Sequence, residues 1–239
     1  MREILGRRRR NRSALLSAAL TCAEQWRWPV VPGAGVQPRP FRDRFGDRGE
    51  ERERGGERRR PARACVCPRG DCPVPGAHPY DPPLLAATTD PRMVHWWWTQ
   101  RPDAPIVAAT GGAVAAVSLP AAAGARVLDY FDALRVRTGP VVATPRRHVL
   151  LVRPYSFDEL GDLLAQQDWV PTSLRYHGPA GYVVLPPSRT GSGGVRWERP
   201  PAADPASPGG APWLPGVADL LGALVAASVA TPDGSRLAY

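Results

Sequence analysis

The stretch Ala104–Leu119, which reads APIVAATGGAVAAVSL, contains two short apolar segments separated by a turn at Gly111. The segments 106–110 and 115–119 are rich in the residues that β-strands prefer. Further apolar segments of this kind follow at residues 141–143, 148–152, 174–176 and 182–185. We expect all six segments to be strands of one sheet.

Two helices are predicted between these strands. Residues 121–134 place Val127, Leu128, Phe131 and Leu134 at helical spacing. The sequence Ser156-Phe-Asp-Glu159 is a capping box, which predicts a second helix that begins there. Strands that alternate with helices, some joined as hairpins, predict an α/β or α+β fold in which helices flank a mixed sheet.

The amino-terminal part predicts two more helices. Ser13 is a candidate N-cap for a helix that continues to about Trp26, and the extended segment 28–32 follows it. Asp90 and Pro91 form a cap and first turn for a helix through Trp96, Trp97 and Trp98. Three adjacent tryptophans cannot share one helix face, so at least one should be partly exposed. Simple packing and base stacking both remain open for them.

The carboxyl-terminal part is less regular. A segment rich in proline, glycine and alanine occupies residues 201–215, and the predicted last helix carries Leu220, Leu221, Leu224 and Val225. We therefore divide the chain into a basic tail (1–12), a main domain (13–200), a linker (201–215) and a helix with a tail (216–239). Within the main domain we expect a disordered arginine-rich insert at 36–63.

The chain has a net charge of +9, and its positive charge comes from arginine because the sequence has no lysine. Arg7–Arg12 and residues 39–63 carry much of the excess, and such clusters favour polyanions. For the second cluster, a solvated linker of mixed charge is the alternative. No segment approaches the roughly 20 apolar residues of a membrane helix, so we expect a cytoplasmic protein without a membrane partner.

Four metal-ligand residues lie close together at 65–78, namely Cys65, Cys67, Cys72 and His78. Prolines and glycines lie between them, and a loop of this kind can fold back to present three thiolates and an imidazole to Zn²⁺. A disulfide with a spare thiol is the alternative. Four protein ligands leave no open position for a substrate, so the sequence predicts a structural zinc knuckle.

Several motifs, taken in order, resemble the amino-terminal domain of bifunctional DNA primase/polymerases, the prim-pol branch of the archaeo-eukaryotic primase superfamily, and most closely its actinobacterial type. The resemblance covers about residues 13–200. It rests on the cysteines with Pro75–Pro79, on Ala87–Asp90, Trp97-Trp98, Ala104–Gly111 and Pro186–Ser188, and on Gly194 and Trp197.

The resemblance implies a polymerase that uses two Mg²⁺ or Mn²⁺ ions held by carboxylates, with a histidine that contacts the incoming triphosphate. Ser118 and Pro120 stand where the family has its pair of acids, and Ser173 stands at the third acid. The nearest other acids, Asp103, Asp129 and Asp132, are not expected to share the face of Ser118. The resemblance therefore implies a degenerate catalytic site, with Mg or Mn relevant only if the protein is active.

Basic residues remain around these positions. The family histidine corresponds to His148 or, with a small shift, to Arg147. We expect a catalytically degenerate protein that still binds single-stranded DNA or a nucleotide through Arg146, Arg147, His148, Arg175 and Ser188. A replication or helicase protein is a candidate partner. The alternatives are an active primase/polymerase with unusual metal ligands, and a non-catalytic interaction scaffold.

Overall fold

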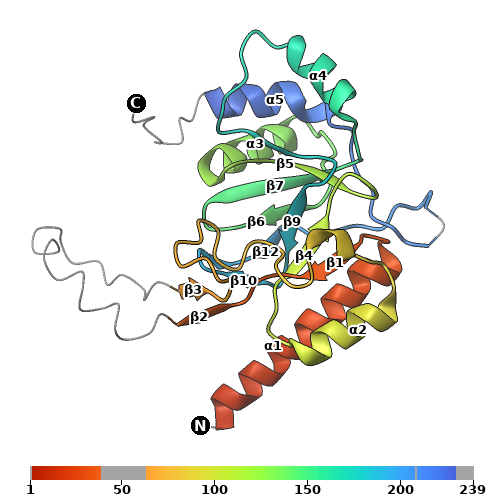
Figure 1. Ribbon diagram of the computed structural model, residues 1–239. Helices are drawn as coiled ribbons and strands as arrows, with labels where there is room; N and C mark the ends of the chain where they lie inside the picture. Colours follow the sequence, from red (N-terminus) through yellow and green to blue (C-terminus); the bar gives the residue numbers. More distant parts are fainter. Residues whose placement is uncertain (1, 39–62, 208, 230–239) are drawn as a thin grey trace, which may run out of the picture.

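Two antiparallel sheets form the centre of the protein in a computed structural model, which describes residues 2–38, 63–207 and 209–229 (Figure 1). The larger sheet has the order β12-β6-β7-β5-β8, and the smaller has the order β1-β4-β9. The larger sheet comprises β5 (Ala115–Pro120), β6 (Val141–Ala143), β7 (Arg147–Val152), β8 (Arg175–His177) and β12 (Arg196–Arg199). The smaller comprises β1 (Val30–Pro32), β4 (Ile106–Ala109) and β9 (Tyr182–Leu185). The fold is α+β, and the prediction of one sheet was wrong.

The chain passes from one sheet to the other at Gly111, between β4 and β5. Gly111 has a φ of +99°, and a Cβ atom there would lie 2.4 Å from the Cα of Pro179. Thr110 secures the same corner, since its hydroxyl donates to the carbonyl of Gly178 at 2.7 Å. Any other residue at 111 would be strained and would also clash with the backbone. The turn therefore directs β5 away from β4 and into the second sheet.

Each face of the larger sheet packs on a different set of elements. Val117, Leu119 and Leu150 lie on the face covered by α3 (Ala121–Ala133), α4 (Phe157–Ala165) and α5 (Ala218–Val229). The opposite face, which carries Ala116 and Val149, packs toward the smaller sheet and the amino-terminal helices. This alternation follows from the two-residue period of strands. Figure 1 shows α3 and α5 together on one side of the sheet.

The amino-terminal helices lie against each other beside the smaller sheet (Figure 1). The first, α1 (Arg2–Leu20), continues into a π-helical turn, η1 (Thr21–Gln25). Ser13, the predicted N-cap, instead lies inside α1. The second, α2 (Pro91–Gln100), begins as predicted, because the side chain of Asp90 accepts a hydrogen bond from the backbone N–H of Arg92 at 2.9 Å.

The remaining elements are short. They are β2 (Val36–Pro38), β3 (Arg63–Cys65), η3 (Leu84–Ala86), β10 (Arg189–Thr190) and β11 (Gly193–Gly194). Strands β2 and β3 pair with each other, so both ends of the predicted insert are structured, and its residues 39–62 lie outside the described residues. Residues 230–239 of the predicted tail also lie outside them. None of the helices described has both the length and the apolar character needed to cross a membrane.

Candidate functional site

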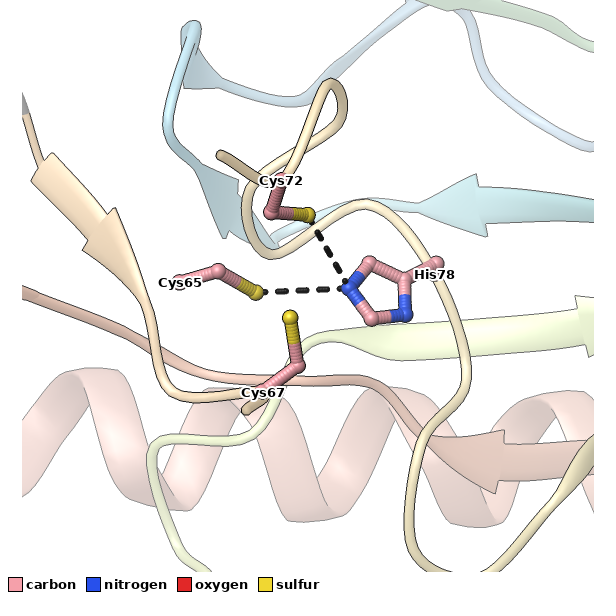
Figure 2. A group of neighbouring side chains, drawn as sticks. All are labelled: Cys65, Cys67, Cys72 and His78. Carbon is pink, nitrogen blue, oxygen red and sulfur yellow. Dashed lines mark hydrogen bonds between the residues drawn. The ribbon is translucent and has the colours of Figure 1, made fainter. Parts of the chain in front are cut away.

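The three cysteines and His78 converge on one point, as Figure 2 shows. Their ligand atoms all lie within 4.8 Å of one another. The Nε2 atom of His78 lies 3.3 Å from the Sγ of Cys65 and 3.4 Å from the Sγ of Cys72. Ligands at zinc bond lengths in a tetrahedron are separated by about 3.5 Å. The geometry and the chemistry of this donor set both fit a zinc ion.

Backbone contacts hold the loop that carries these ligands. Cys65 ends β3 and pairs with Val36 of β2. Gly76 donates its backbone N–H to the Sγ of Cys65 at 3.4 Å, and a Cβ atom at Gly76 would lie 2.6 Å from Val36. The Nδ1 of His78 donates to the carbonyl of Pro79 at 2.8 Å, which leaves Nε2 free of a proton and available to a metal.

The thiols of the cluster influence one another when no metal is bound. Burial raises the pKa of Cys65, but the hydrogen bonds that its sulfur accepts, chiefly from the backbone of Cys67 and Gly76, outweigh it, and its pKa falls to about 7. Burial also raises the pKa of Cys72, and the sulfurs of Cys67 and Cys65 add to this effect, so that its pKa reaches about 11. Ionisation of one thiol therefore makes ionisation of the next thiol less favourable. A dication removes this conflict, because it stabilises all the thiolates together.

The positions predicted as degenerate lie around the end of β5. Ser118 is 1% exposed, and its register partners are Val149 of β7 and Arg175 of β8. Pro120 is the last residue of β5 and pairs with Arg147. Ser173, which is 7% exposed, lies just before β8. Neighbouring strands thus bring these separated residues to one end of the sheet.

The guanidinium of Arg147 connects two of these positions. Its Nε donates to the Oγ of Ser118 at 3.1 Å. Its Nη2 donates to the carbonyl oxygens of Ser118 and Ser173, each at 2.6 Å. A planar guanidinium has several donors in a fixed geometry, which suits three acceptors that lie around it. A fixed positive charge therefore lies between Ser118 and Ser173.

His177 completes this cluster and was missed by the sequence analysis. Its Nε2 lies 2.9 Å from the Oγ of Ser118. Burial and, after it, the charge of Arg147 lower the pKa of His177 to about 4, so its ring is neutral at pH 7. Because Arg147 donates to the Oγ of Ser118, the hydroxyl proton of Ser118 can be donated to the neutral ring. The near-complete burial of Ser118 leaves its hydroxyl out of reach of a substrate.

The residues predicted to bind nucleotide divide between two faces of the larger sheet. Arg147 and Arg175 lie on the face of Ser118, and Arg175 is exposed. His148, the next residue along β7, faces α3 and donates from Nδ1 to the carbonyl of Ala121 at 3.1 Å. Gly124 makes room for it, because a Cβ atom there would lie 2.3 Å from the His148 Nδ1.

The other two residues predicted to bind nucleotide, Arg146 and Ser188, have surroundings different from those of the Ser118 cluster. Arg146 is exposed in the turn before β7. Ser188 is 1% exposed, and its Oγ accepts a hydrogen bond from the backbone N–H of Ile106 at 2.7 Å. Among the acids considered as substitute ligands, Asp103 pairs with Arg12 at 2.7 Å and Asp132 pairs with Arg199 at 2.6 Å.

Across residues 2–38, 63–207 and 209–229, the knuckle is the one group of three or more histidine, cysteine, aspartate or glutamate side chains that could hold a metal ion. No such group of carboxylates lies around Ser118 in this part of the chain. The two candidate sites therefore differ in the residues that they offer to a cation.

Comparison with known proteins confirms the family resemblance seen in the sequence. Residues 19–212 match the model of the family described as bifunctional DNA primase/polymerase, N-terminal. The comparisons with curated proteins and with solved structures give no match. The family match spans most of the chain and includes both the knuckle and the Ser118 cluster. The protein therefore belongs to the Prim-Pol family of bifunctional DNA primase/polymerase amino-terminal domains.

Proposed function

We propose that this protein is a catalytically inactive member of its family that binds single-stranded DNA or a nucleotide without a catalytic metal. The observation that carries the proposal is the placement of the Arg147 guanidinium, which is fixed by Ser118 and by the carbonyl of Ser173. Family resemblance assigns these serine positions to metal-binding acids. On that assignment, a guanidinium that belongs to the protein takes the place of the family's metal ions.

A guanidinium in place of metal ions explains why catalysis should be lost while binding persists. Two-metal polymerisation needs hard cations close together, one of which activates the attacking hydroxyl. A guanidinium can neutralise phosphate charge and donate to phosphate oxygens. It cannot lower the pKa of a bound hydroxyl as a divalent ion does. We therefore assign Arg147 to charge complementarity at this site.

Arg175 is the exposed partner of Arg147 in this proposal. It lies on the edge strand β8, directly opposite Ser118 in the register, so its side chain shares the face of the cluster. Its charge contributes to the lowering of the pKa of His177, which indicates that it is close. Arg146 adds a third positive charge in the exposed turn before β7. We assign His148 and Ser188 to the stability of the fold, because contacts within it engage both side chains.

The same proposal includes one structural zinc ion in the knuckle. Cys65, Cys67, Cys72 and His78 would supply all four ligands and leave no position for a substrate. The zinc would hold the loop that contacts the β10–β11 hairpin, where Gly191 donates to the carbonyl of Pro75 at 2.7 Å. Metal analysis of the purified protein should find one zinc for each chain.

The test uses zinc-loaded protein in buffer freed of Mg²⁺ and Mn²⁺. We expect labelled single-stranded DNA or a nucleoside triphosphate to bind. Added Mg²⁺ should strengthen binding by less than about threefold, since no carboxylate cluster that could hold a cation lies around Ser118 in the described residues. Affinity for DNA should fall as salt rises. Arg175→Ala should weaken binding, while Arg126→Ala removes the same charge from an exposed position on α3 and serves as the matched control.

Two results would contradict the proposal. Primer synthesis on a single-stranded template with Mn²⁺ would show an active enzyme with unusual ligands. Failure to bind both DNA and nucleotides at low salt would favour an interaction scaffold.

A further inference from the structure

The three adjacent tryptophans of α2 have different surroundings. Trp97 and Trp98 are 6% and 1% exposed and belong to the core beside the smaller sheet. Trp96 is 56% exposed. An indole is among the largest apolar side chains, and leaving it in water forgoes a substantial gain from burial. Packing therefore accounts for Trp97 and Trp98 but not for Trp96.

The exposed face of α2 has the residues that a single strand of nucleic acid requires. Arg92, Trp96 and Gln100 are all exposed and lie four residues apart, so they follow one another along about 12 Å of helix. Met93, His95 and Thr99 are also exposed. The helix contains no aspartate or glutamate. An aromatic ring beside a cation and amide donors can stack a base and contact its phosphate.

The charges next to α2 are consistent with an anionic partner. Arg10 is exposed on α1, the helix that packs against α2. Two of the nearby acids are engaged in contacts, because Asp90 caps α2 and Asp103 forms an ion pair with Arg12. Glu24, in the η1 segment that contacts α2, is an exposed acid. A polyanion that approaches this face therefore meets Arg92 without a carboxylate from α2 itself.

A second exposed tryptophan provides a comparison. Trp169 is 61% exposed, close to the value for Trp96. It follows Asp168 in the sequence, and the helix before it, α4, carries Asp158, Glu159 and Asp162, all exposed. A polyanion would be repelled by these charges. Exposure alone does not distinguish the two indoles, but the charge around them does.

We propose that the exposed face of α2 is a stacking platform for single-stranded nucleic acid, in which Trp96 stacks on a base and Arg92 contacts a phosphate. This inference rests on the proposed function, because it requires that the protein binds nucleic acid. It adds a second contact surface and assigns one tryptophan to it. A protein partner with an acidic surface is the competing occupant.

The test measures the binding of a labelled oligothymidylate of about twelve nucleotides, which lies within the usual site size of such proteins. Trp96→Ala should lower the affinity by about 5-fold to 150-fold, the equivalent of one stacked base. Trp96→Phe should retain most of the affinity and lose part of the fluorescence quenching on binding. Arg92→Ala should reduce the slope of log K against log salt by about 0.7. Trp169→Ala is the matched control and should bind as the unaltered protein does.

The outcomes separate this inference from the proposed function. Binding that is unchanged in Trp96→Ala, or reduced equally in Trp169→Ala, would overturn the platform and leave the function in place. Binding of a nucleoside triphosphate without binding of the oligonucleotide would do the same. Absence of binding to either probe would overturn both. Equal zinc content and thermal unfolding among the variants would exclude misfolding as the cause.

Discussion

The zinc knuckle and the Ser118 cluster are two places where protein donors converge, and they differ in charge. The knuckle gathers three thiols and an imidazole around a point that a dication fits. The Ser118 cluster gathers a hydroxyl, carbonyl oxygens and an imidazole around a guanidinium that is part of the chain. Both are compact and hydrogen-bonded. The charge of the donors, more than their convergence, therefore decides whether such a site suits a metal ion.

The largest expected effect concerns the knuckle. Cys72→Ser should prevent tight zinc binding and unfold the loop, because structural zinc sites in small domains contribute on the order of 10 kcal/mol to folding. Metal analysis and limited proteolysis between residues 63 and 82 would measure the loss. Cys22→Ala is the control, since Cys22 is buried in the core away from the cluster, and it should keep one zinc. Full zinc content in Cys72→Ser would refute the assigned ligand set.

Removal of Arg147 should have the next largest effect. Arg147→Ala leaves the Ser118 hydroxyl and two carbonyl oxygens without their donor, so we expect a loss of about 3 kcal/mol in the free energy of unfolding. Arg147→Lys should recover less than half of it, because an ammonium cannot reproduce the fork of the guanidinium. Urea unfolding of both variants gives the values. Unchanged stability in Arg147→Ala would mean that the cluster does not depend on its cation.

The pH dependence of stability tests the environment of His177. The unfolded chain takes up a proton at this histidine near its ordinary pKa of 6.5, whereas the folded protein does so only near a pKa of about 4. Stability should therefore fall as the pH drops from 6.5 toward 4, by up to about 3 kcal/mol. His177→Gln lacks this titration. Its stability should change less over the same range, and parallel curves for the two proteins would contradict the burial of a neutral ring.

The smallest expected effect is on metal binding at the Ser118 cluster. Ser118→Asp restores one carboxylate, but Arg147 lies within hydrogen-bonding distance and should pair with it. Affinity for Mn²⁺, followed by its paramagnetic resonance signal, should therefore change by less than about tenfold, since one paired acid makes a poor site for a hard dication. The double variant Ser118→Asp with Arg147→Ala should bind Mn²⁺ more tightly than the single one. Equal binding by the two would show that Arg147 does not control the site.

Local patterns in the sequence predicted much of the fold. The six apolar segments became β4, β5, β6, β7, β8 and β9 with small shifts at their ends. Asp90 and Ser156 both cap helices as expected, because capping depends on residues three positions apart or fewer. The four knuckle ligands also lie within one short loop. Predictions of this kind rest on contacts between near neighbours in the chain.

The features that the sequence did not predict depend on contacts between residues that are far apart in the chain. His177 and Ser118 are 59 positions apart and meet only because β5 pairs with β8. The division into two sheets depends on the corner at Gly111, where the crowding atoms belong to Pro179. The sequence analysis grouped Arg147 with His148 as binding residues, although adjacent residues of a strand face opposite sides of a sheet. The face on which each lies depended on the pairing of β7 with β5.

The pairing of Pro38 with Arg63 has a consequence for protein engineering. The two ends of the intervening segment are held side by side by the pairing of β2 with β3, next to Cys65 of the knuckle. The entropic cost in free energy of closing a loop rises only with the logarithm of the loop length, by about 0.6 kcal/mol for each doubling. A tag or a whole reporter domain inserted between these strands should therefore leave the metal content and the core unchanged. The segment between β2 and β3 is therefore a suitable site for an internal tag.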